Sequence, residues 1–217
     1  MTNDSAGVSR ERVKGSNESV AAYSQRPAKK HRQEMAMVAR AMPSIPAGSR
    51  VLDAPCGAGR LSVWMAAQGW RVSALDIGEA AVAHTAGVIS ANHLRAEVIE
   101  GDVFHMPWQD RYFAAVVCFR LLHHFDDLAA RRALLAELAR VSDGHLLVSY
   151  LSPFSYSGLR RWLKWRLTGR KHRQNHTSLS ELIWIMASQG FVLVNDQQQS
   201  GVWRSLRLAH FKRAPER

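Results

Sequence analysis

Residues 51–60 read Val-Leu-Asp-Ala-Pro-Cys-Gly-Ala-Gly-Arg, an apolar run that ends in an acidic residue and passes into a glycine loop. Glycines at positions 57 and 59 let the backbone turn sharply and let a ligand approach the chain without meeting a Cβ atom. Residues 61–68 then read as a helix that Gly69 ends, and the start of a helix offers free backbone N–H groups. The stretch therefore predicts a short strand, a ligand-binding turn and a helix.

Segments typical of strands and helices alternate along most of the remaining chain. The expected strands cover residues 50–53, 71–76, 96–100, 112–119, 145–150, 191–195 and 202–211. The expected helices cover residues 20–42, 61–68, 79–92, 128–141 and 179–189. Pro43 and Pro46 end the first of these helices, and Asp126 or Asp127 is placed to cap the fourth.

This alternation, with short connections, means right-handed crossovers and a mainly parallel sheet. Residues 112–119 are rich in β-branched and aromatic side chains, which is typical of a central strand buried on both faces. The last two strands have no helix between them, so we expect them to pair antiparallel.

Polar residues follow the strands in order along the chain. Asp76 ends the second strand, Gly101-Asp102 follows the third, and residues 118–125 after the fourth read Cys-Phe-Arg-Leu-Leu-His-His-Phe. In sheets of this kind ligands bind beyond the carboxyl ends of the strands, and a carboxylate after the second strand can accept both hydroxyls of a ribose. Together with the glycine loop, these features predict one ligand site at one edge of the sheet.

The motif set resembles that of the class I S-adenosylmethionine-dependent methyltransferases, over residues from about 20 to 211. The family's loop is usually acidic-x-Gly-x-Gly-x-Gly, and here it reads Asp53-x-Pro55-x-Gly57-x-Gly59, a Pro-Cys-Gly variant that also occurs in bacterial members. The resemblance implies an α/β fold, a Rossmann-like three-layer sandwich whose seven-stranded, mostly parallel sheet has an antiparallel C-terminal strand. It also implies a single methyltransferase domain at 19–217. Residues 1–18 are rich in Ser, Asn, Gly and charged residues, a composition that predicts a disordered tail.

The resemblance implies a set of residues that bind the cofactor, S-adenosylmethionine: Asp53, Ala54, Gly57, Gly59, Asp76, Ile77, Asp102, Val103, Phe119 and Arg120. Asp53 and the two glycines would surround the methionine portion, and Asp76 would hold the ribose diol. Asp102 would bond the adenine amino group, with the next residue beside the ring. Phe119 and Arg120 would lie near the sulfonium end.

A nicotinamide-dependent dehydrogenase shares this fold and the carboxylate after the second strand. Its Gly-x-Gly-x-x-Gly fingerprint needs a third glycine for close packing of helix on strand, but here the sequence 57–62 ends in Ser62. Asp53 also sits where dehydrogenases usually have the first glycine. A cofactor-binding subunit without catalysis is a third class, against which the complete motif set argues.

Methyl transfer from a sulfonium is an in-line displacement, so the protein mainly has to align acceptor, methyl group and sulfur. A base is needed only when the nucleophile must lose a proton. His123 and His124, just after the fourth strand, are the candidate catalytic residues, because histidine titrates near working pH. The alternative is that both side chains only pack at the start of the next helix.

An insertion at about 151–177 is the expected acceptor-binding element, because this fold commonly adds recognition segments after its fifth strand. Its basic side chains, expected to contact the acceptor, are Arg160, Arg161, Lys164, Arg170 and Lys171. They could be a solvated surface, a contact to anionic lipid or a phosphorylated glycolipid or saccharide, or a contact to structured RNA. No Asn-Pro-Pro-Tyr motif for base amino-group methylation follows the fourth strand. This favours O-methylation of a small molecule or glycolipid, with an RNA methyltransferase as the alternative.

The formal net charge of +11 at pH 7 also favours an anionic partner. No apolar run approaches the roughly 20 residues needed to span a bilayer, and residues 1–15 lack the apolar core of a secretory signal. We therefore expect a cytoplasmic protein, with a membrane-peripheral one as a variant. Cys56 and Cys118 form no metal-spaced pair and are too few for a disulfide scaffold, so we expect no metal.

Overall fold

The structure is a computed structural model that describes residues 28–153, 175–199 and 205–215. The expected tail at 1–18 lies outside these ranges. So do the basic side chains expected to contact the acceptor, Arg160, Arg161, Lys164, Arg170 and Lys171.

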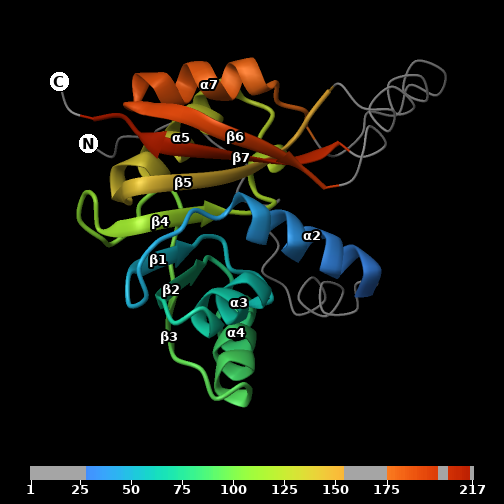
Figure 1. The fold of residues 1–217 in the computed structure, drawn as a ribbon, viewed down its shortest axis with the longest axis vertical. Coiled ribbons are helices and arrows are strands. Elements are labelled where there is room, and N and C mark those ends of the chain that lie inside the picture. Colours follow the sequence, from blue (N-terminus) through green and yellow to red (C-terminus); the bar gives the residue numbers. More distant parts are fainter. Residues whose placement is uncertain (1–27, 154–174, 200–204, 216–217) are drawn as a thin grey trace, which may run out of the picture.

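A seven-stranded sheet with the order β3-β2-β1-β4-β5-β7-β6 forms the centre of the molecule (Figure 1). Its strands are β1 (Arg50–Asp53), β2 (Arg71–Asp76), β3 (Ala96–Glu100), β4 (Phe113–Cys118), β5 (Ser142–Leu151), β6 (Phe191–Gln198) and β7 (Leu206–Arg213). The helices are α2 (Ala28–Ala41), α3 (Arg60–Ala67), α4 (Glu79–Ala91), α5 (Leu128–Val141) and α7 (Leu179–Ser188), with the short 3₁₀ helix η2 at Leu122–His124.

The strand directions confirm the predicted topology. Strands β1 to β5 pair in parallel, and β7 runs antiparallel to both of its neighbours. The sequence did not indicate that β7 enters the sheet between β5 and β6. The crossover from β3 to β4 has no helix: residues 101–112 form only turns and loop.

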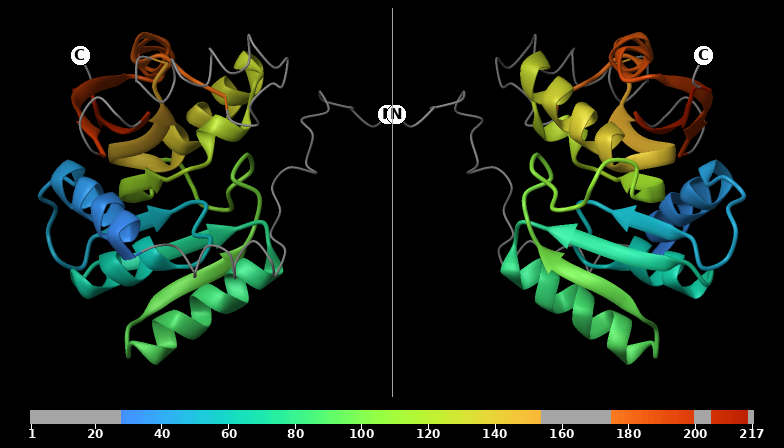
Figure 2. Two further views of the ribbon diagram at one scale, coloured as in Figure 1. Left: turned by 90° about the vertical axis from the view of Figure 1, so that its right-hand side faces the viewer. Right: turned by 90° about the vertical axis from the view of Figure 1, so that its left-hand side faces the viewer.

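Side chains of β4 face two separate cores, as predicted for a central strand. Val116 and Cys118 pack with α5 and α7, whereas Ala115 and Val117 pack with α2 and α3 on the other face. In Figures 1 and 2, α5 and α7 lie at the end of the molecule formed by β5, β7 and β6, while α3 and α4 lie at the opposite end, beside β1, β2 and β3. β1, which leads into the glycine loop, and its neighbour β4 are therefore held between the two cores.

The element boundaries differ from the prediction where tertiary contacts decide them. β5 begins at Ser142, directly after α5, and β6 continues to Gln198. α2 ends at Ala41, just before the prolines that were expected to stop it. Asp127 is the cap of α5, since its carboxylate accepts a bond from the Ala130 N–H at 3.1 Å.

No helix in the described ranges is long and apolar enough to cross a bilayer.

A pair of histidines, of which His210 is buried and His145 half-buried, joins β5 to β7. His145 Nδ1 lies 2.9 Å from His210 Nε2, and Asn195 Nδ2 lies 3.4 Å from the other ring nitrogen of His210. His210 is only 3% exposed, and burial, followed by the proximity of His145 and Lys212, lowers its pKa to about 4. The amide of Asn195 donates to His210 Nδ1, so the neutral ring of His210 donates from Nε2 to His145.

This pair predicts an acid-sensitive fold. The pKa of His210 falls on folding from 6.5 to about 4, so its stabilising contribution is present above pH 6.5 and is lost as the pH falls toward 4. We expect this group alone to lower the free energy of unfolding by about 2 kcal/mol between about pH 6.5 and pH 4.5. Urea unfolding across this range measures the loss, which should be smaller in His210→Gln. If the free energy of unfolding fell equally with pH in the wild type and in His210→Gln, His210 would not be the group responsible.

Candidate functional site

The glycine loop after β1 is fixed by hydrogen bonds to both neighbouring strands. The Ala54 N–H donates to the Val117 carbonyl of β4 at 3.0 Å, and the Cys56 N–H donates to the Leu75 carbonyl of β2 at 2.9 Å. Ala54 is fully buried, so its side chain packs in the core beneath the loop. The loop is thus held rigidly at the carboxyl ends of the strands.

The two glycines of the loop have left-handed backbone angles, with φ of 54° at Gly57 and 70° at Gly59. A Cβ atom at Gly59 would lie 2.9 Å from both Thr85 Oγ1 and Val88 Cγ2 of α4. Gly57 has open space at the same position, which suits the approach of a ligand. Gly59 therefore serves the packing of α3 against α4, a role that the sequence did not indicate.

Asp76 at the end of β2 holds the loop in place. Its Oδ2 accepts the Gly57 N–H at 2.9 Å, and its Oδ1 accepts the Gly78 N–H at 3.0 Å. The residue is 6% exposed, and burial raises its pKa, although the backbone N–H groups oppose that shift. Each carboxylate oxygen can accept more than one hydrogen bond, so the remaining lone pairs suit the two adjacent hydroxyls of a ribose.

Asp53 lies beneath the loop with no exposed surface. Ser62 Oγ donates to its Oδ2 at 2.7 Å, while the buried Oδ1 has no hydrogen-bond partner in the described part of the chain. Burial raises the pKa of Asp53 to about 7, and the nearby Asp76 adds to the shift. A buried carboxyl with one unsatisfied oxygen is stabilised by a cation placed close by. The residues present therefore fit a ligand that carries positive charge and vicinal hydroxyls, as S-adenosylmethionine does.

The predicted adenine contacts follow β2 and β3, which pair in register up to Asp76 and Glu100. Ile77 is 40% exposed, which is unusual for a large apolar side chain, and Val103 is buried. Asp102 is partly exposed, and its Oδ1 accepts the Phe104 N–H at 3.0 Å. An exposed apolar side chain near a fixed carboxylate suits a flat heterocycle with an amino group.

The backbone turns sharply at the end of β4. Arg120 has a φ of 64°, a backbone conformation that residues other than glycine rarely adopt. Its N–H donates to Ser149 Oγ on β5, and its Nη1 lies 2.9 Å from Glu34 Oε1 on α2. Phe119 packs against the core formed with α2 and α3. Both residues thus lie at the same edge of the sheet as the glycine loop.

The two candidate catalytic histidines follow on η2, with their ring centroids 4.4 Å apart. His123 is buried, whereas His124 is half-buried. Burial lowers the pKa of His124, and the positive charge of Arg120 lowers it further. His124 is therefore neutral at pH 7 and can accept a proton, while the burial of His123 fits a packing role better.

The ends of the insertion are anchored at this edge. The Asn175 N–H donates to the His123 carbonyl at 2.9 Å, the Thr177 N–H donates to the Leu151 carbonyl at 3.0 Å, and the Ser152 N–H donates to the Ser205 carbonyl at 2.8 Å. The C-terminal end of the insertion thus lies beside the histidines, and its two ends are joined by the bond between Thr177 and Leu151.

Sequence reasoning missed several residues of the site. Ser62, noticed only because it is not glycine, is the hydrogen-bond donor to Asp53. Glu34, which bonds Arg120, is the one acidic residue of α2. It precedes Met37, Val38 and Ala41 by three, four and seven positions, which is the spacing of one helix face, and those residues are buried. A lone acid on the apolar face of a basic helix was the signal that could have revealed it.

Comparison with known proteins agrees with this geometry. Residues 25–196 match the family described as Methyltransferase domain. The ribosomal RNA small subunit methyltransferase C of Alcanivorax borkumensis is 39% identical over 62 residues, 29% of this chain and 19% of that protein. The ubiquinone biosynthesis O-methyltransferase of Azotobacter vinelandii is 39% identical over 88 residues, 39% of this chain and 37% of that protein. The chain therefore spans well under half the length of these curated relatives.

Among solved structures, the magnesium protoporphyrin IX methyltransferase of Synechocystis PCC 6803 with bound SAH has a similar fold. The TM-score is 0.71 at 19% identity, and the match covers 86% of this chain and 84% of that one. The family match over most of the chain, the strand order and the carboxylates at the glycine loop agree. The chain belongs to the methyltransferase domain family and has the Rossmann-like fold of the S-adenosylmethionine-dependent methyltransferases.

Proposed function

We propose that the protein transfers a methyl group to a hydroxyl of a small-molecule acceptor or of an anionic glycolipid or saccharide. The observation that carries this proposal is the half-buried His124, which lies at the carboxyl edge of the sheet with its pKa lowered by burial and by Arg120. A neutral imidazole at this place can accept the proton that a hydroxyl loses on methylation. Among the curated relatives are O-methyltransferases of ubiquinone biosynthesis.

In this mechanism the bound cofactor supplies a methyl group already activated by its sulfonium. Asp76 would orient the ribose, and the negative charge of Asp53 would stabilise the cationic ligand from beneath the loop. His124 would take the proton of the acceptor hydroxyl as the new O–CH₃ bond forms and the S–CH₃ bond breaks. Burial and the positive charge of Arg120, which both lower the pKa of His124, would keep it unprotonated between turnovers.

The acceptor would enter beside the insertion, whose C-terminal end is fixed next to His123 by Asn175. In this proposal residues 19–217 form one domain, with the acceptor-side insertion at about 151–177. The basic residues of the insertion would bind an anionic group of the acceptor. The protein would work in the cytoplasm, at the membrane surface if the acceptor is a lipid.

The role of Asp76 can be tested without knowing the acceptor. We expect Asp76→Asn to weaken the binding of S-adenosylhomocysteine by about 100-fold, because charge-assisted bonds to two hydroxyls are lost and an amide opposes the loop N–H groups. Titration calorimetry measures the affinity. Glu100→Gln is the matched control, since Glu100 is an exposed acid at the end of the adjoining strand. Equal affinities for the two variants would refute the assignment.

The role of His124 can be tested in the pH dependence of transfer. Because the pKa of His124 is lowered, kcat/KM of the wild type should stay level through pH 7 and fall only below about pH 6.5, where the ring takes up a proton. We expect His124→Gln to slow transfer by about 100-fold and to remove this acidic limb, with cofactor affinity unchanged. The assay follows labelled methyl transfer to the first hydroxyl acceptor identified in a compound screen. If His124→Gln kept the wild-type rate and the fall of kcat/KM at acidic pH, His124 would be excluded as the base.

A second candidate function is RNA methylation. Two relatives are ribosomal RNA small subunit methyltransferases, at 39% and 44% identity over 62 and 59 residues, and the net charge of +11 suits a polyanion. The matched segments cover 29% and 27% of this chain.

The two acceptor classes differ in what the protein should bind. If the acceptor is small or lipidic, we expect weak binding to bulk RNA, and anionic vesicles should retain the protein if the acceptor is a lipid. If the acceptor is RNA, log K should fall steeply with log salt, with a slope of about −0.7 per phosphate contact on a single strand. Filter binding and vesicle sedimentation at several salt concentrations separate the cases. Steep salt dependence on RNA, with no binding to vesicles, would favour the RNA methyltransferase.

A further inference from the structure

Helix α2 brings a buried acid to the edge of the sheet that carries the glycine loop. Glu34 is 1% exposed, although α2 is otherwise basic and has no other acidic residue. Its Oε1 lies 2.9 Å from Arg120 Nη1, and its Oε2 lies 3.5 Å from Arg60 Nη2. One carboxylate thus contacts two guanidinium groups from two other segments.

Each of these arginines belongs to a segment of the cofactor site. Arg60 is the first residue of α3 and directly follows Gly59, while Arg120 occupies the strained turn after β4. A second residue of α2 also contacts Arg60, because His31 Nδ1 lies 2.9 Å from Arg60 Nη1. A guanidinium can only donate, so His31 Nδ1 accepts this bond. α2 therefore reaches the glycine loop and the β4 turn at once.

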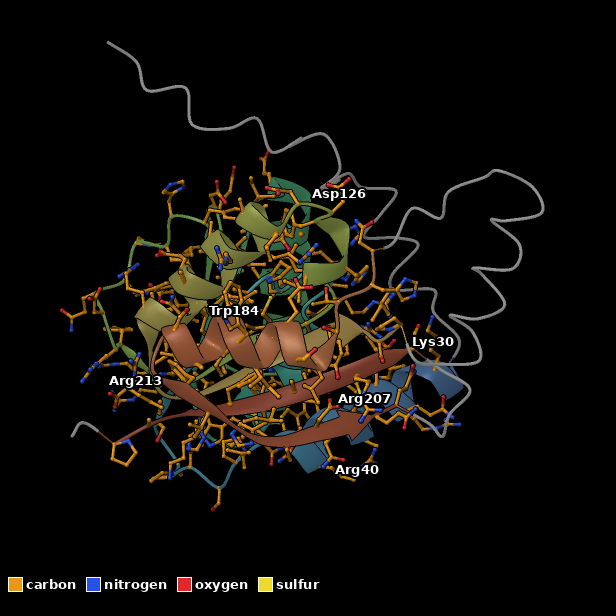
Figure 3. The ribbon with its side chains drawn as sticks, turned by 90° about the horizontal axis from the view of Figure 1, so that it is seen from above. Lys30, Arg40, Asp126, Trp184, Arg207 and Arg213 are labelled. Atoms are coloured by element: carbon orange, nitrogen blue, oxygen red, sulfur yellow. The ribbon has the colours of Figure 1, made fainter. Side chains whose placement is uncertain are left out.

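Apolar packing alone does not account for the position of Glu34. Met37, Val38 and Ala41 pack in the core with α3 and with β7, which secures the second half of α2. Glu34 lies nearer the first half, between Lys30 and Arg40, which Figure 3 labels near the two ends of the helix. A buried carboxylate that loses a partner is strongly destabilising, so the two arginines help to keep this half of α2 docked.

We infer that Glu34 is a positioning residue that fastens α2 to the Arg60 and Arg120 segments, so that docking of α2 and binding of the cofactor stabilise each other. The inference rests on the proposed function in one respect, that the site binds S-adenosylmethionine. A ligand on the glycine loop orders the segments that carry Arg60 and Arg120, and these hold α2. By linkage, a docked α2 must raise the affinity for the ligand by the same factor.

The experiment compares full-length wild type with Glu34→Gln, using S-adenosylhomocysteine as the probe. Glu34→Gln should weaken probe binding by about tenfold, within the range of typical coupling energies. Amide hydrogen exchange in residues 28–41 should be faster than in the wild type, and the probe should no longer slow it. Asp143→Asn is the matched control, because Asp143 is exposed at the start of β5, at the opposite edge of the sheet.

Two further variants keep the test decisive. If Glu34→Gln does not fold, Arg120→Lys retains the charge but changes the geometry, and it should show the same two effects to a smaller degree. A combined Glu34→Gln and Arg120→Gln protein should lose less affinity than the product of the two single losses, because the pair acts as a unit.

The opposite outcomes are equally distinct. If the variants bind the probe as Asp143→Asn does and the probe still slows exchange in α2, Glu34 has only a structural role and the inference is overturned. If the wild type itself binds no probe, the proposed function fails. In that case amide exchange without the probe still tests whether Glu34 holds α2 in place. Faster exchange of α2 in Glu34→Gln than in the wild type supports this role, and equal exchange overturns it.

Discussion

Three carboxylates, Asp53, Asp76 and Glu34, are almost completely removed from water at one edge of the sheet, and a buried charge must be matched by its surroundings. Each is matched differently. Asp76 receives two backbone N–H groups, Glu34 receives two arginines, and Asp53 receives one serine hydroxyl. The incomplete match at Asp53, where burial raises the pKa to about 7, is where a cationic ligand would gain most.

The remainder of the fold serves to hold these groups still. β1 and β4 are short and buried between two apolar cores, so the loop after β1 and the turn after β4 have little freedom to move. Gly59 lets α3 approach α4 closely, and Asp76 ties the loop to the next strand. Methyl transfer depends on alignment more than on acid and base groups, so this rigidity is itself the main catalytic contribution expected of the chain.

Much of this arrangement could be predicted from the sequence. The strands at 50–53, 71–76 and 96–100 have the predicted bounds, because apolar runs followed by glycine or acidic residues mark both the strand and the turn. The placement of the glycine loop and of Asp76 followed from the same local signals. The antiparallel pairing of the last two strands was also confirmed, since no helix separates them.

Other features depend on contacts between distant segments and could not be predicted. The pairing of Glu34 with Arg120 spans 86 positions, and a sequence gives no measure of which basic residue a buried acid will meet. The left-handed turn at Arg120 contains no glycine, so no residue in the sequence predicts it. Likewise, β5 begins at Ser142 because pairing with β4 extends the strand back to the end of α5. The basic side chains of the insertion lie outside the described residues, so their contacts are predictions.

The position of β7 between β5 and β6 has a consequence for the order of folding. Among the described strands, β6 pairs only with β7, and β7 is the later of the two in the chain. During synthesis on the ribosome, β6 would therefore emerge with no neighbour to join, and the free edge of β5 would stay open until residues 206–213 had left the exit tunnel. Such late, non-local pairing slows folding and leaves the edge of β5 open to pairing with other chains until β7 is added.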